Sequence, residues 1–90
     1  MPEKVQIEII NKLGLHARAA SKLVATASRF ESKIDINKDG QMADAKSIMS
    51  VLMLAASKGM LLNIEASGAD EKEALQAICE LINNRFDEAE

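Results

Sequence analysis

Ninety residues form a single domain, because a chain of this length has room for only one hydrophobic core. Hydrophobic residues make up 48% of the chain and charged residues 28%, which is typical of a globular protein, and neither a membrane span nor a signal peptide is recognisable. The net charge of −3 argues against a nucleic-acid binder or a polybasic membrane-surface module. From these observations together we expect a cytoplasmic protein without membrane insertion.

A strand and a helix are predicted at the start of the chain. Apolar residues at positions 5, 7 and 9 alternate with polar ones, as they do in a strand with one buried face, and Gly14 closes this strand. From His16 onward the apolar residues recur at helical spacing, which predicts a helix over residues 17–29. His16 is therefore expected at the start of a helix.

Two further strands and a short helix are predicted next. Alternation returns around Ile34, and Asp39-Gly40 favours a hairpin turn because this dipeptide tolerates positive φ angles. A strand over residues 41–44 follows the turn. Ser47 is expected to cap a short helix over residues 48–56.

The last part of the chain predicts a fourth strand and a long helix. Residues 61–67 alternate, and Asp70 and Glu73 have the spacing of a capping box that opens the helix. Phe86 lies near the end of this helix, and residues 87–90 are expected to fray in solvent. The order is β-α-β-β-α-β-α, and the alternation indicates an α+β fold: a four-stranded antiparallel sheet covered on one face by three helices.

The only histidine of the chain gives the strongest functional signal. The first N–H groups of a helix lack partners and can bind an anion, and the helix dipole disfavours a charged imidazolium at His16. Arg18 can bring a guanidinium to the same point, where it would pair with phosphate oxygens. A phosphoryl group on His16 would thus lie among N–H donors and one cation.

Simpler interpretations of His16 stay open on these residues alone. A lone histidine near a helix start is often a cap or a surface residue. A metal site is not expected, because no second His or Cys lies nearby, and no cofactor is expected either. A hydrolase triad would need a partner Ser or Cys in a cleft that so short a chain can barely form. A small RNA-binding domain would need exposed aromatic residues, but the chain has only two.

Three segments resemble the motifs of one known family. The segment 11–18, Asn-Lys-Leu-Gly-Leu-His-Ala-Arg, is similar to the active-site signature of HPr, the phosphocarrier of the bacterial phosphoenolpyruvate-dependent phosphotransferase system. The segment 46–49 resembles the regulatory serine motif of the family, and the segment 67–71 resembles the start of its last helix. The resemblance extends over nearly the whole chain and implies an open-faced β-sandwich.

The resemblance also implies roles for individual residues. His16 would receive a phosphoryl group from enzyme I on Nδ1 and pass it to an EIIA-type protein, and Arg18 would stabilise the phosphate. Ser47 would be the serine that HPr kinase/phosphorylase modifies where that enzyme exists. The protein would be a monomeric carrier rather than an enzyme. An apolar patch would dock on the partners, formed by Leu15, Ala17, Ile48, Met49 and Leu52.

Some questions remain open within the resemblance. The family usually has proline where this chain has Ala19, which would leave the first helical turn slightly more mobile. Segments 11–14 and 81–86 look as much like the nitrogen-related branch of the family (NPr) as like the sugar-transport branch. A regulatory interaction module that is not phosphorylated on histidine is a further alternative. Ser47 also has a plain structural role as a helix cap, and the two roles are compatible.

Overall fold

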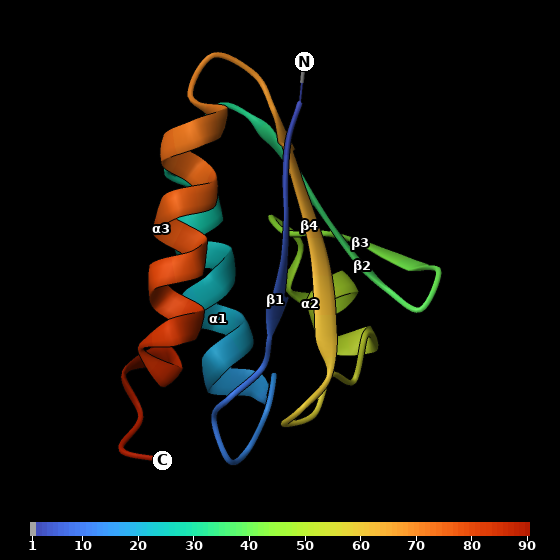
Figure 1. The fold of residues 1–90 in the computed structure, drawn as a ribbon, viewed down its shortest axis with the longest axis vertical. Helices are drawn as coiled ribbons and strands as arrows, with labels where there is room; N and C mark the ends of the chain where they lie inside the picture. Colours follow the sequence, from blue (N-terminus) through green and yellow to red (C-terminus); the bar gives the residue numbers. More distant parts are fainter. Residues whose placement is uncertain (1) are drawn as a thin grey trace.

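The computed structural model describes residues 2–90, and the predicted β-α-β-β-α-β-α order is confirmed (Figure 1). A short turn of 3-10 helix, η1, is added after the last helix. No helix of the described part of the chain is both long enough and apolar enough to cross a membrane. The elements in chain order are β1 (Glu3–Glu8), α1 (Ala17–Ala27), β2 (Lys33–Lys38), β3 (Gln41–Asp44), α2 (Ile48–Met53), β4 (Leu61–Ser67), α3 (Glu71–Asn83) and η1 (Arg85–Asp87).

The four strands form one antiparallel sheet in the order β1-β4-β2-β3. Ile64 in the central strand β4 lies opposite Val5 of β1 on one side and opposite Ile36 of β2 on the other. A slip of one residue would turn these apolar side chains to the solvent face, so their burial determines the register. The alternation read from the sequence therefore corresponds to one covered and one open face of the sheet.

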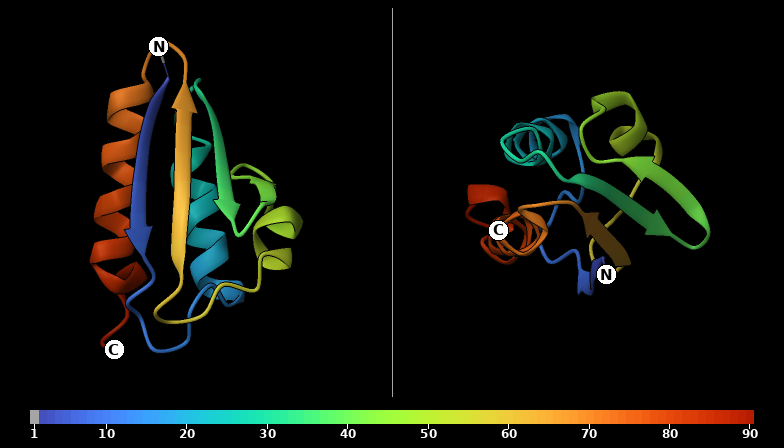
Figure 2. Two further views of the ribbon diagram at one scale, coloured as in Figure 1. Left: turned by 45° about the vertical axis from the view of Figure 1, so that its right-hand side comes forward. Right: turned by 90° about the horizontal axis from the view of Figure 1, so that it is seen from above.

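The helices cover one face of this sheet, as Figure 2 shows. Helix α3 contacts β1 and β4, α1 packs against α3 and α2, and α2 contacts β3. Helix α1 presents the fully buried alanines Ala19 and Ala20 to the core, and Phe86 after α3 is also fully buried. The open face is polar, with cross-strand pairs such as Gln6 with Asn63. The predicted fold class is confirmed.

Two helices end earlier than predicted. Helix α1 ends at Ala27 and is followed by tighter turns, in which the N–H of Phe30 donates to the carbonyl of Ala27. Helix α2 ends at Met53, three residues before the predicted end, and Ala55 beyond it has a φ of 49°. The chain therefore leaves α2 early and passes close to the loop that precedes α1.

The predicted capping box at α3 is wrong. Asp70 does occupy the N-cap position, but its carboxylate does not bond its own helix. It accepts hydrogen bonds instead from the N–H groups of Glu31 and Ser32 and from the Ser32 hydroxyl. Glu73 takes no part in this cap, and Glu71 accepts from the N–H of Gly68 at 3.0 Å. The carboxylate of Asp70 thus joins the start of α3 to the segment that leads into β2.

Candidate functional site

The loop between β1 and α1 makes a tight turn at Gly14, which has a φ of +66°. The N–H of Gly14 donates to the carbonyl of Asn11 at 3.2 Å, and the N–H of Leu15 donates to the carbonyl of Ala56 at 2.9 Å. A Cβ atom on Gly14 would lie 2.5 Å from the carbonyl oxygen of Ala56. Only glycine therefore fits here, because both the positive φ and the close approach exclude a side chain.

His16 is the N-cap residue of α1, but its side chain makes no capping hydrogen bond. The first intrahelical bond runs from the N–H of Ala20 to the carbonyl of His16 at 2.8 Å. The N–H groups of residues 17–19 consequently have no carbonyl partner within the helix. The His16 side chain is 29% exposed, so its ring is accessible beside a helix end that favours anions.

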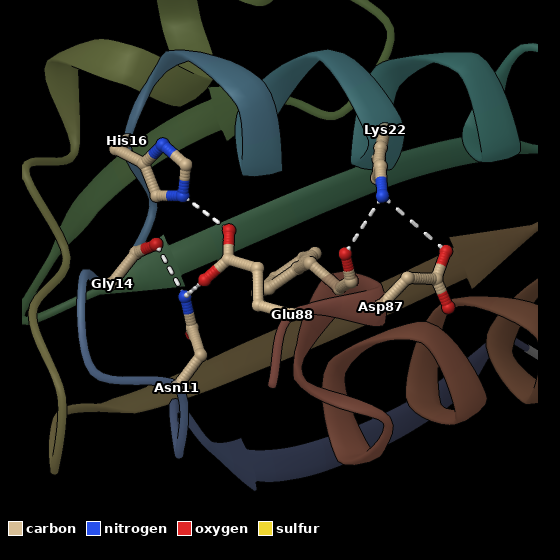
Figure 3. A network of polar contacts seen from close by, with 7 residues as sticks. Asn11, Gly14, His16, Lys22, Asp87 and Glu88 are labelled. Atoms are coloured by element: carbon tan, nitrogen blue, oxygen red, sulfur yellow. Dashed lines mark hydrogen bonds and ion pairs between the residues drawn. The ribbon is translucent and has the colours of Figure 1, made fainter. Parts of the chain in front are cut away.

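A carboxylate from the far end of the chain contacts this ring. Nε2 of His16 is hydrogen-bonded to Oε2 of Glu88 (Figure 3). The other carboxylate oxygen, Oε1, accepts from Nδ2 of the buried Asn11 at 3.1 Å. The same Nδ2 donates to the carbonyl of Gly14 at 2.8 Å. The turn, the histidine and the carboxylate therefore belong to one connected polar network.

Residues 87–90 are largely exposed, as expected, but the expectation that they fray is wrong. Phe86 just before them is fully buried, and its carbonyl accepts from Nζ of Lys22 at 3.0 Å. The N–H of Lys12 donates to the carbonyl of Glu90 at 2.7 Å. The buried ring of Phe86 and these hydrogen bonds hold the segment against α1 and the Gly14 turn.

The ionisation of Glu88 is set by its place in the network. Burial raises the pKa of the Glu88 carboxyl, but the hydrogen bonds from His16 and Asn11 lower it, as do electrostatic interactions with His16 and Arg18. The net pKa lies below the ordinary value of a glutamate. Glu88 is therefore a carboxylate at neutral pH. No local pattern pointed to it, since it lies 72 residues from His16 in the chain.

Arg18 lies where the sequence predicts it, on the first turn of α1. It is exposed and lines the same surface hollow as His16, together with Lys12, Leu13 and Glu88. Lys12 is paired with Glu90, which also lines the hollow, so Arg18 is the cation there that can neutralise an added anion. Among residues 2–90 no group of three or more His, Cys, Asp or Glu side chains is placed to hold a metal ion.

Ser47 is the N-cap residue of α2, as predicted. Its hydroxyl oxygen accepts from the N–H of Ser50 at 3.4 Å, and its side chain is partly accessible. Helix α2 packs against α1, the helix that carries His16. The predicted cap is confirmed, and the structure places it on the neighbour of the histidine helix.

The predicted docking patch needs one correction. Leu15 is only 4% exposed, because it packs into the core beneath the turn, and so it offers no surface to a partner. Ala17 is exposed, Ile48 and Met49 are 39% and 65% exposed, and Leu52 is partly buried. The part of the patch that remains accessible consists of Ala17, Ile48, Met49 and Leu52, and we call it the α1–α2 patch.

Known proteins resemble this chain in both sequence and structure. The family model for the phosphorylation site of the HPr component of the phosphotransferase system matches residues 3–84. The phosphocarrier protein HPr of Neisseria meningitidis serogroup A is 52% identical, over 97% of this chain and 98% of its own. The phosphocarrier protein NPr of Shewanella violacea is 45% identical, over 93% of this chain and 92% of its own. A crystal structure of HPr from Thermoanaerobacter tengcongensis superposes with a TM-score of 0.94 at 45% identity and covers 98% of this chain and 99% of that one.

Proposed function

The chain belongs to the HPr family of phosphocarrier proteins, and on that premise we propose that Nδ1 of His16 is the atom that carries the phosphoryl group. The phosphoryl group is accepted from enzyme I and donated to an EIIA-type protein. The observation that supports this assignment best is the position of the ring, which is partly exposed at the N-terminus of α1 with Nε2 engaged by Glu88. Of the two ring nitrogens, Nδ1 is thus the one left free of Glu88.

The surroundings of His16 suit a phosphoryl group. The N–H groups of residues 17–19 lack helical partners and can donate to its oxygens, and the guanidinium of Arg18 can neutralise its charge. Transfer between two histidines depends on in-line geometry and charge neutralisation. An accessible surface site meets that need, because both the donor and the acceptor are proteins. The chain then acts as a stoichiometric carrier in the cytoplasm rather than as an enzyme.

We place the carrier in sugar transport or its regulation. The identity of 52% to an HPr against 45% to an NPr supports this assignment over the nitrogen branch, in which the protein would act mainly as a regulatory phosphorelay. The two branches are distinguished by the partner: a carrier of the sugar branch is phosphorylated faster by the enzyme I of that branch than by its nitrogen-branch counterpart.

We further propose that the α1–α2 patch docks on enzyme I and EIIA-type proteins. Its residues are apolar, accessible and carried by the two helices that meet beside the site. Ser47 lies at the start of α2 next to Ile48, so a phosphate placed on it by HPr kinase/phosphorylase would add negative charge to the edge of this surface. Ser47 would then control docking rather than folding.

Phosphorylation by enzyme I tests the central assignment. The protein is incubated with enzyme I, Mg²⁺ and labelled phosphoenolpyruvate, and one phosphate that is labile in acid and stable in base is expected. His16→Ala should abolish the label while the circular dichroism stays native, and Glu73→Gln, an exposed change on α3, serves as the control. A normally labelled His16→Ala variant would show that the assignment is wrong.

A further inference from the structure

We propose that Glu88 is a positioning residue for phosphoryl transfer: its carboxylate holds the His16 ring through Nε2 and stabilises the positive charge that the ring gains when Nδ1 is phosphorylated. This inference rests on the proposed function of His16. It concerns a residue outside the segment 3–84 that the family model matches, and it follows from contacts between the two ends of the chain.

The contact determines which ring nitrogen is free. An ionised carboxylate only accepts hydrogen bonds, so the proton of the neutral His16 ring must reside on Nε2, where it faces Oε2 of Glu88. Nδ1 then keeps its lone pair. Figure 3 shows Nδ1 on the side of the ring that points away from Glu88. One hydrogen bond therefore sets both the tautomer and the direction of the nucleophilic atom.

The carboxylate is itself held in place. Asn11 is fully buried and donates from Nδ2 to Oε1 of Glu88 at 3.1 Å and to the carbonyl of Gly14 at 2.8 Å. Each carboxylate oxygen thus has one partner, and both partners belong to the loop and helix start that form the site. Such a network fixes the orientation of a side chain better than a single exposed contact does.

The backbone that delivers Glu88 has an unusual conformation. Arg85, Phe86 and Asp87 have φ angles of 56°, 53° and 64°, three consecutive L-residues in the left-handed region. The burial of Phe86 and the hydrogen bond from Lys22 to its carbonyl hold this turn. The turn follows α3 and directs Glu88 to His16. Strain of this kind persists only where surrounding contacts maintain it, and it often occurs next to functional groups.

The Glu88 carboxylate interacts with the positive charge that phosphoryl transfer creates on the His16 ring. The Nδ1 lone pair of His16 forms the new N–P bond while the N–P bond of the donor phosphohistidine breaks, and that electron pair returns to the donor ring. No proton leaves Nε2, so the His16 ring becomes cationic as the donor ring becomes neutral. A hydrogen bond from a cationic ring to a carboxylate is stronger than one from a neutral ring. Glu88 therefore stabilises the transition state more than the starting state.

The test compares Glu88→Ala and Glu88→Gln with Glu73→Gln, a control that removes one carboxylate from an exposed position on α3. The single-turnover rate of transfer from phosphorylated enzyme I should fall about tenfold in Glu88→Ala, the size expected for one charge-assisted hydrogen bond. The glutamine in Glu88→Gln can still accept a hydrogen bond from Nε2, so the rate of transfer should fall less than in Glu88→Ala. Glu73→Gln should retain the rate of the original chain.

Nuclear magnetic resonance of the unphosphorylated protein supplies a readout that is independent of enzyme I. The Nε2–H proton of His16, observed at an alkaline pH where a histidine ring is neutral, should give a low-field signal in the original chain. This signal should move upfield in Glu88→Gln and be lost through solvent exchange in Glu88→Ala.

Three outcomes would overturn the inference: the same Nε2–H signal with and without Glu88, a lost signal with an unchanged rate of transfer, or a faster rate in Glu88→Ala. The last result would mean that the segment obstructs the site. Failure of the proposed function is recognised separately, because the original chain would then not be labelled at His16 whatever the Nε2–H signal shows.

Discussion

Asp70 at the start of α3 accepts hydrogen bonds from both the backbone N–H and the hydroxyl of Ser32, which precedes β2. The hydrogen bond from the Ser32 hydroxyl lowers the pKa of Asp70 most, and the N–H of Glu31 lowers it further, against the opposing effect of burial. The two residues are 38 positions apart, so this contact connects the start of the last helix to the sheet without support from local sequence.

The lowered pKa of Asp70 makes stability depend on pH in acid. Because its pKa is lower in the folded than in the unfolded chain, the contribution is complete above the unfolded value, about 3.9 for an aspartate, and is lost as the pH falls through the folded value. Asp70→Asn should lower stability at neutral pH and flatten the decline in acid. Urea unfolding across this pH range measures the free energy of unfolding of both proteins. An equal fall of this free energy in acid for the original chain and for Asp70→Asn would contradict the prediction.

Truncation of Phe86 should both destabilise the fold and free the segment after it. Phe86 is 0% exposed, so Phe86→Ala should cost about 3–5 kcal/mol of unfolding free energy through lost burial and a cavity. The amide of Lys12, which bonds the carbonyl of Glu90, should also exchange faster. Phe86→Leu should lose less stability and keep this amide protected. Unchanged protection in Phe86→Ala would show that the backbone contacts alone hold the segment.

Alanine substitutions at Gly14 and Gly59 distinguish the cost of a steric clash from the cost of a positive φ angle. Both have positive φ, but a Cβ on Gly14 would lie 2.5 Å from the Ala56 carbonyl oxygen, whereas nothing lies within 4 Å at Gly59. Gly59→Ala should cost about 1–2 kcal/mol through conformation alone. Gly14→Ala should cost roughly 1–3 kcal/mol more, because the backbone has to move. Equal losses in thermal or urea unfolding would mean that the turn relaxes freely.

Docking through the α1–α2 patch predicts a binding defect without unfolding. Met49 is 65% exposed at the start of α2, so Met49→Glu should weaken the binding of enzyme I while the circular dichroism stays native. Met42→Glu places the same charge at a 59% exposed site on β3 and should bind as the original chain does. Titration calorimetry measures both. A similar loss in both variants would point to net charge rather than to the patch.

A negative charge at position 47 should slow phosphoryl transfer from enzyme I without affecting the fold. Aspartate is a good N-cap, so Ser47→Asp should keep α2 intact while it slows phosphorylation by enzyme I, because a charge buried against a partner is costly unless it is paired. Ser47→Ala should show the reverse, with about 1 kcal/mol of stability lost and a normal rate. If Ser47→Asp is phosphorylated at the original rate, Ser47 is only a cap.

Much of this fold could be predicted from the sequence, because helical and strand periodicities are local properties of the chain. The alternation around Ile36 and Ile64 marked the buried face of the sheet, and both side chains face the core. The single histidine was placed at the start of α1 by the change of period after Gly14. Ser47 was identified as a cap because a cap bonds the N–H group three residues ahead, again a local relation.

Only the tertiary structure decided what surrounds these residues. The bond of Glu88 to His16 depends on the turn at residues 85–87 after α3, and charged residues in this part of a sequence give no sign of such a contact. The carboxylate of Asp70 bonds Ser32 rather than its own helix, and Leu15 is buried although it adjoins the site. Residue types and their spacing predicted the elements and the position of His16 at the start of α1. The partners of each polar group were determined by packing, which brings together side chains that no local pattern relates.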